Sequence, residues 1–268
     1  MAKAGKVYLF IILFLLALSV AAPLLPLHDP NRIDLDSLRI SPNAEHPFGT
    51  DEKGRDIFSR VIYGSKISIS VALAAAFASA CIGSIIGLTA GYFGGRIDTI
   101  AMAAVDFILS FPSLLLVIAI SVVLPPGIYT VMIALSAAGW TSFARLIRGQ
   151  VLAVKELPFV DAARAIGCSN ARIIFVHIVP VCLPLSLVMM GIKLGGFILA
   201  EATLSFLGLG LQPPAPSWGA MVSASRAYIL TAPWTVFFPG LMITVTAFCF
   251  NLFAEKLKGR YDVGRIKG

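Results

Sequence analysis

The stretch Pro158–Pro180, PFVDAARAIGCSNARIIFVHIVP, is a polar and charged interruption between long hydrophobic segments. Pro158 can begin a helix, because the N–H that proline lacks has no partner in the first turn. Gly167 is placed to end that helix, and Ser169 or Asn170 can cap a second helix that runs into the next hydrophobic segment. The stretch therefore predicts a short helix held outside a bilayer between two spans.

The sequence on both sides of this stretch has the composition of an integral membrane protein. Apolar residues make up 58% of the 268 residues and charged residues only 13%, with a mean hydropathy of +0.89. About 20 helical residues cross a hydrocarbon core, and six segments qualify, at approximately 7–27, 67–93, 99–124, 128–146, 180–207 and 233–253. We expect an all-α protein with six transmembrane helices, because helices satisfy their backbone polar groups within lipid.

Basic residues are distributed unevenly between the loops. With a cytoplasmic N-terminus, 13 of the 21 lysines and arginines fall on the cytoplasmic side and seven on the other, and Lys193 lies within a span. This bias follows the positive-inside rule and predicts that both termini are cytoplasmic. It also explains the net charge of +7 without nucleic acid, since the sequence has no compact basic face or aromatic platform.

The predicted spans divide the chain into three parts. Residues 1–66 hold the first membrane helix and an extracytoplasmic loop, which ends in a short helix expected to lie on the membrane surface. Residues 67–257 form a core with five membrane helices and a cytoplasmic loop at about 145–179, and residues 258–268 form a cytoplasmic tail. Trp218 and Trp234 are expected at the level of the lipid headgroups.

Four glycines in the second predicted span recur at every fourth position: Gly83, Gly87, Gly91 and Gly95. One helix face is therefore bare of side chains, and another helix can approach it closely. The partner of this face is either another span of this chain or a span of a second subunit.

Sequence motifs for catalysis and metal binding are absent. The segment Gly49–Asp56, GTDEKGRD, begins like a phosphate-binding loop but continues with Arg-Asp where Lys-Ser or Lys-Thr is required. His28, His46 and His177 are isolated in the sequence, and the four cysteines are too widely separated to imply a zinc site or a disulfide framework. We expect no catalytic residue, no metal site and no cofactor bound by this chain.

Three ionisable residues fall within predicted spans, where charges are costly and usually face a bundle interior or an aqueous path: Asp106, Lys193 and Glu201. One interpretation is that they line a pathway for a polar or zwitterionic solute, with Lys193 near mid-depth. The alternative is an internal ion pair between Lys193 and Asp106, with Glu201 as a charge near the end of a helix.

The short cytoplasmic helix carries an apolar stripe formed by Phe159, Ala162, Ala163 and Ile166, at spacings i, i+3, i+4 and i+7. Its small side chains suit a shallow groove in a partner protein. The alternative is an amphipathic helix that rests on its own bilayer, for which bulkier anchors are typical. The alanines favour the partner.

The same residues resemble a known sequence element. The string DAARAIG followed by Ile-x-Pro is similar to the EAA loop of permease subunits of binding-protein-dependent ABC importers, with Asp161 in the glutamate position, then Ala162, Ala163 and Gly167. The spacing departs from the usual pattern by one residue, since ten residues rather than nine precede Ile178.

Three further stretches narrow the resemblance to the C-type permeases of dipeptide, oligopeptide and nickel importers. They are HPFGTDEKGRDIFSRVIYG, ILAEATLSFLGLGLQPPAPSWGAM and FPGLMITVTAFCFNLFAEKLK, and with the EAA-like stretch they lie in the family's order across residues 28–257. The usual G-D-G-L-R-D ending is replaced here by Ala254–Lys258.

The resemblance implies a type I ABC importer permease fold in the inner (plasma) membrane of a bacterial or archaeal cell. The implied partners are a homologous B-type permease, two cytosolic ATPases that bind ATP and Mg²⁺, and an extracytoplasmic solute-binding protein. The Asp161–Gly167 helix would be the coupling helix seated on an ATPase. The expected function is alternating-access import of dipeptides or oligopeptides; import of nickel or a nickel chelate and a non-transporting membrane scaffold are the alternatives.

Overall fold

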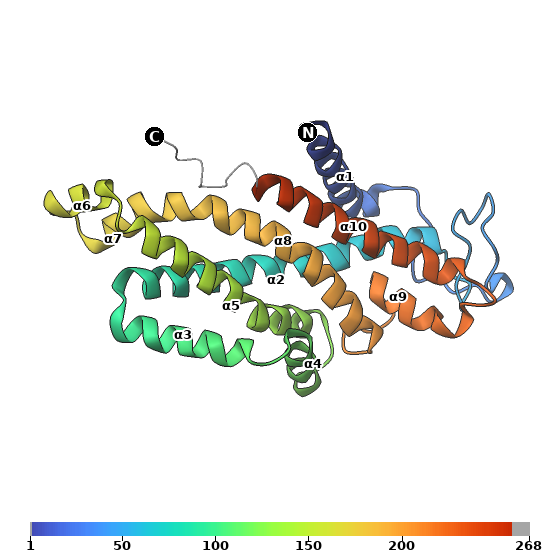
Figure 1. The fold of residues 1–268 in the computed structure, drawn as a ribbon. Coiled ribbons are helices and arrows are strands. Elements are labelled where there is room, and N and C mark those ends of the chain that lie inside the picture. Colours follow the sequence, from blue (N-terminus) through green and yellow to red (C-terminus); the bar gives the residue numbers. More distant parts are fainter. Residues whose placement is uncertain (1, 259–268) are drawn as a thin grey trace.

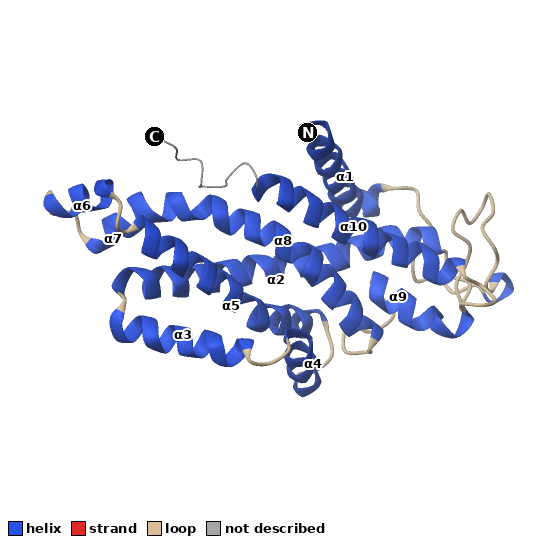
Figure 2. Ribbon diagram, viewed as in Figure 1, coloured by secondary structure: helices blue, strands red, loops and turns tan. Residues whose placement is uncertain are grey.

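The structure, a computed structural model, describes residues 2–258, so the expected tail at 258–268 lies outside it apart from Lys258. The described part is helical and contains no β-strand, as Figure 2 shows. Its α-helices are α1 (Ala2–Ala21), α2 (Ile57–Phe93), α3 (Gly95–Leu109), α4 (Ser113–Val123), α5 (Ile128–Val154), α6 (Pro158–Ala165), α7 (Asn170–Arg172), α8 (Val179–Phe206), α9 (Trp218–Ser225) and α10 (Trp234–Lys258). Short 3-10 turns are η1 (Ala22–Leu24), η2 (Leu35–Ser37) and η4 (Arg226–Tyr228), and η3 (Ile173–Ile178) is a π-helical segment.

Five of the described helical segments are long and apolar enough to cross a membrane: Val7–Leu24, Ile57–Phe93, Ile128–Val154, Asn170–Phe206 and Trp234–Lys258. A sixth span exists if α3 and α4 count as one, although they meet at an angle of 88°. The all-α membrane fold is thus confirmed, but the continuous helix predicted at 99–124 is wrong. Pro112 explains the break, because it lacks an N–H and disfavours helical geometry in the residue before it.

The long helices form an extended bundle (Figure 1). α2, α5, α8 and α10 run lengthwise, with α6 and α7 at one end and the loop of residues 25–56 at the other. One apolar core joins most of the bundle, and it includes Ile12 of α1, Ile69 of α2, Leu135 of α5, Ile198 of α8 and Phe250 of α10. The cytoplasmic end predicted from the sequence and the long loop are therefore at opposite ends of the same rigid helices.

The glycine face of α2 packs against α5 of the same chain. A Cβ on Gly83 would meet the backbone oxygen of Trp140, and one on Gly87 would lie 2.5 Å from the Ala144 oxygen. Gly95 does not belong to this face, because α2 ends at Phe93 and Gly95 is the first residue of α3, with φ +55° and open space around it. Of the two partners considered for the glycine face, another span of the same chain is therefore the one observed.

Two expectations about the part predicted to be extracytoplasmic differ from the structure. The short surface helix is the first part of α2, which Asp56 caps by accepting a hydrogen bond from the Ser59 N–H. Trp218 is fully buried within the chain, so its side chain is not available to lipid headgroups. The predicted surface helix and the predicted span at 67–93 thus form one continuous helix in the structure.

Candidate functional site

A cavity of about 420 Å³ is lined by residues of α4, α5 and α8. Its wall is mainly apolar, and Lys193 is the charged residue in the lining. Ser113 and Val117 of α4, Leu135 and Gly139 of α5, and Phe197 of α8 also contribute. An apolar cavity with a few polar groups is the usual form of a small-molecule site.

Lys193 is half-buried on α8 and forms no ion pair within the described part of the chain. The alternative of an internal pair with Asp106 is therefore wrong. Asp106 pairs instead with Arg145, and both side chains of that pair are largely exposed. The Lys193 ammonium remains available to a group that enters the cavity.

Glu201 lies on the same helix but outside the cavity lining. Its side chain is buried and accepts a hydrogen bond of 2.8 Å from the Ser205 hydroxyl, which in turn accepts one of 3.4 Å from Ser217. The second carboxylate oxygen of Glu201 has no partner in the described residues. Of the three intramembrane candidates, Lys193 alone lines the cavity.

The short helix α6 is built as its sequence predicts. Pro158 occupies the first turn, and Gly167 follows the helix with φ +82°. The Gly167 N–H donates to the Arg164 oxygen at 2.9 Å, and the Cys168 N–H donates to the Ala163 oxygen at 3.0 Å. These two bonds form a Schellman motif, which uses a glycine because the left-handed conformation is costly for other residues.

The predicted apolar stripe of α6 divides between two faces. Ala163 is buried together with Val160, which the stripe did not include. Phe159, Ala162 and Ile166 are exposed, and Ile166 keeps 81% of its surface open. The helix therefore attaches to its own chain through one face and leaves an apolar face uncovered. Asp161 is also exposed and pairs with Arg164 at 3.1 Å.

The buried face of α6 belongs to a compact cluster at the end of the bundle. This cluster, called here the base cluster, contains Ile147, Val151 and Val154 of α5, Val160 and Ala163 of α6, Ile173 and Ile178 of η3, and Cys182 of α8. Ser169 caps the helix that follows, and the Tyr92 hydroxyl at the end of α2 donates to Asn170 at 2.8 Å. The helix α6 thus shares an apolar cluster with α5 and α8, two of the helices that line the cavity.

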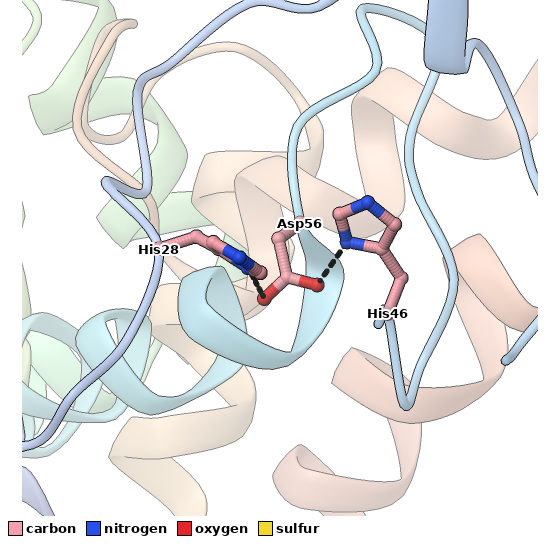
Figure 3. A group of neighbouring side chains, drawn as sticks. All are labelled: His28, His46 and Asp56. Carbon is pink, nitrogen blue, oxygen red and sulfur yellow. Dashed lines mark hydrogen bonds and ion pairs between the residues drawn. The ribbon is translucent and has the colours of Figure 1, made fainter. Parts of the chain in front are cut away.

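A second group of side chains was not expected from the sequence. His28 and His46 converge on Asp56 at the start of α2 (Figure 3). The loop that carries the two histidines lies at the end of the bundle opposite α6 (Figure 1). The interpretation of these two histidines as isolated is therefore wrong. The loop between the two histidines is irregular, so no periodicity in the sequence predicts that they lie close together.

Comparison with protein families matches residues 83–263 to the binding-protein-dependent transport system inner membrane component family. The chain is 42% identical over 94% of its length to the probable D,D-dipeptide transport system permease protein DdpC of Escherichia coli, of which it covers 85%. It is 41% identical over 97% of its length to the dipeptide transport system permease protein DppC of Bacillus subtilis, of which it covers 82%.

A similar fold occurs among solved structures. An inward-facing structure of the MetNI methionine ABC transporter superposes with a TM-score of 0.53 at 18% identity, covering 74% of this chain and 96% of that one. At this identity the likeness concerns the fold, and it extends the family match to the arrangement of the helices.

Proposed function

Because the chain belongs to the family of binding-protein-dependent transport system inner membrane components, we propose that it forms, with a homologous B-type permease, the path of an ATP-driven peptide importer. It is a multi-pass inner-membrane permease component of an ABC importer and not itself the ATPase. The observation that carries the proposal is that α5 and α8 line the cavity at one level and hold α6 at another.

A peptide substrate is supported by the chemistry of the cavity. A short peptide has a carboxylate at one end, which the Lys193 ammonium attracts in a low-dielectric site. The apolar wall accommodates side chains of varied shape. The two relatives described above are named as a probable D,D-dipeptide permease and a dipeptide permease, which agrees with this assignment. A bare nickel cation is not favoured, since Lys193 would repel it.

The coupling step follows from the attachment of α6. Phe159, Ala162 and Ile166 form the exposed face that would enter a groove of a cytosolic ATPase, with Asp161 and Gly167 beside it. Closure of the ATPases on ATP would press α6 against the base cluster. Because α5 and α8 share that cluster, they would rock together and change which side of the membrane the cavity faces.

The orientation and partners complete the assembly. The positive-inside bias supports cytoplasmic termini, so α6 faces the ATPases and the loop of residues 25–56 faces an extracytoplasmic solute-binding protein. ATP and Mg²⁺ belong to the two ATPase subunits, because this chain has no Lys-Ser/Thr after its GxxxxG segment. The permease itself binds no cofactor in this scheme.

The test is transport by the whole complex, purified from its native membrane through a tag on this chain and reconstituted with its binding protein. We expect ATP-dependent uptake of a labelled dipeptide or tripeptide, and weaker uptake of the same peptide with an amidated C-terminus. Lys193→Met should reduce uptake of the free acid to the level of the amide, whereas Lys193→Arg should retain the preference.

Two results would contradict the proposal. Co-purification of the chain without ATPase subunits would favour a membrane scaffold. Uptake of nickel without uptake of peptide would show that the substrate is nickel and not a peptide. If the Lys193→Met and wild-type complexes transport peptides at equal rates, Lys193 does not contact the substrate, although the protein is still an importer.

A further inference from the structure

The group formed by His28, His46 and Asp56 has the composition of a metal site. The Nδ1 atom of His46 lies 3.0 Å from Asp56 Oδ1, and the Nδ1 atom of His28 lies 3.9 Å from Asp56 Oδ2. One ligand atom from each of the three residues falls within 4.8 Å of the others. Figure 3 shows the two imidazoles on either side of the carboxylate.

The carboxylate is held in place independently of the histidines. Asp56 is buried, and its Oδ2 accepts hydrogen bonds from the Ser59 N–H at 2.8 Å and the Ser59 hydroxyl at 2.6 Å. Such outer hydrogen bonds orient a ligand and are typical of metal sites. The Oδ1 atom has His46 as its only side-chain neighbour among the described hydrogen bonds.

The positions of the histidines permit a small closure around an ion. Ligand atoms of a tetrahedral zinc site lie about 3.3 Å apart, given metal–ligand distances near 2.0–2.2 Å. The His46 to Asp56 distance of 3.0 Å is close to this value, and the His28 side chain must move inward. His28 can do so because it lies on an irregular segment after η1 and is 48% exposed.

We propose that His28, His46 and Asp56 bind a divalent transition-metal ion, with zinc as the best match, and that the ion fastens the long loop to the start of α2. Two imidazoles and one carboxylate suit zinc, with water in the fourth position, whereas Mg²⁺ and Ca²⁺ prefer oxygen ligands. This replaces the prediction of no metal site. The bound ion would join the chain shortly after η1, the second half of the loop and the N-cap of α2.

The consequence is a stiffer extracytoplasmic end. His28 and His46 are separated by 17 residues of mostly irregular chain, and both lie far from α6 in the bundle. An ion that binds the folded loop and not the unfolded chain stabilises the fold by mass action. On the orientation proposed above, this end is the surface presented to the solute-binding protein, but metal binding itself does not depend on transport.

The test uses the full-length chain purified without a polyhistidine tag, treated with EDTA and titrated with Zn²⁺ by calorimetry. We expect saturation at one ion per chain and a higher Tm with zinc but not with Mg²⁺. Replacement of Zn²⁺ by Co²⁺ should give the visible absorption of a tetrahedral site. His28→Ala and His46→Ala should each weaken zinc binding at least about tenfold, the lower bound for loss of an outer-shell partner.

His177→Ala is the matched control, because His177 lies on η3 at the other end of the molecule. It should leave the zinc titration unchanged, and the four cysteines are the same in every variant. His28→Ala preserves the His46–Asp56 hydrogen bond, so it separates metal binding from folding of the loop. Zinc binding that survives both His28→Ala and His46→Ala, or that is absent from the wild type, overturns the proposal.

Discussion

The indole nitrogen of Trp218 donates a hydrogen bond of 2.9 Å to the backbone carbonyl of Val61. Trp218 begins α9, Val61 lies in the first part of α2, and both side chains are buried. The backbone N–H of Trp218 also donates a hydrogen bond of 3.3 Å to the Ser68 hydroxyl. The start of α9 is therefore attached to α2 by one large buried side chain and two hydrogen bonds.

Trp218→Phe should lower the thermal stability of the purified chain. The substitution removes the indole N–H, leaves a buried carbonyl without its extra partner and opens a small void, at a cost of about 1–3 kcal/mol. The measurement is the Tm in detergent by a fluorescence-independent method such as light scattering. Trp140→Phe is the control, since the Trp140 indole donates no hydrogen bond within residues 2–258; equal losses in both variants would argue against a role for the bond.

Gly87→Ala should destabilise the pairing of α2 with α5. The new methyl group would lie 2.5 Å from the Ala144 oxygen and 3.0 Å from the Ile147 Cβ, so the two helices must separate. Overpacking of this kind costs about 1–3 kcal/mol. Gly149→Ala, within α5, meets nothing within 4 Å and should be neutral or stabilising by up to about 1 kcal/mol. Comparison of the two Tm values in the same detergent gives the result, and a neutral Gly87→Ala would contradict the close packing.

Gly167→Val should uncouple ATP hydrolysis from uptake while the protein still inserts. The site has open space, so the penalty comes from the backbone at φ +82° and amounts to about 1–2 kcal/mol. Loss of the Schellman turn would change the angle of α6. Gly167→Asn is the control, because asparagine accepts the left-handed conformation. Uptake per ATP hydrolysed in proteoliposomes measures coupling, and normal coupling in Gly167→Val would remove the assigned role of this turn.

Ile166→Ala and Val160→Ala should affect different properties: the first ATPase binding, and the second stability. Ile166 is 81% exposed, so its truncation should leave the Tm of the isolated chain unchanged and weaken retention of ATPase subunits. Val160 is 0% exposed, so Val160→Ala should lower stability by about 2 kcal/mol through loss of packing in the base cluster. Tm and the yield of co-purified ATPase are measured for both. If Ile166→Ala retains the ATPase fully, the exposed face of α6 is not the docking face.

Local chemistry allowed much of this fold to be predicted. Hydrophobic length identified the spans, proline and glycine placed the ends of α6, and Ser169 was identified as one of two possible caps for the next helix. These features depend on residues close together in the chain. The bend at Pro112 was missed because hydropathy continues across it, although the proline itself was the local signal.

The distribution of α6 residues between two faces was decided by tertiary contacts. Periodicity gave a stripe that included Ala163, but the base cluster selected Val160 and Ala163 for burial and left Ile166 open. Periodicity predicts that residues share a face and not which neighbour covers it. The sequence likewise does not show which basic residue lies next to Asp106. The partner in the structure is Arg145 and not Lys193.

By itself, the sequence determined that this chain is a helical membrane protein with a short capped helix between two spans, because span length and capping act locally. Only the tertiary structure decided that Lys193 faces a cavity, that α6 shares a core with α5 and α8, and that His28 and His46 meet at Asp56. The physical reason is that these relationships join segments separated by irregular chain or by whole helices, whose mutual positions are fixed by packing.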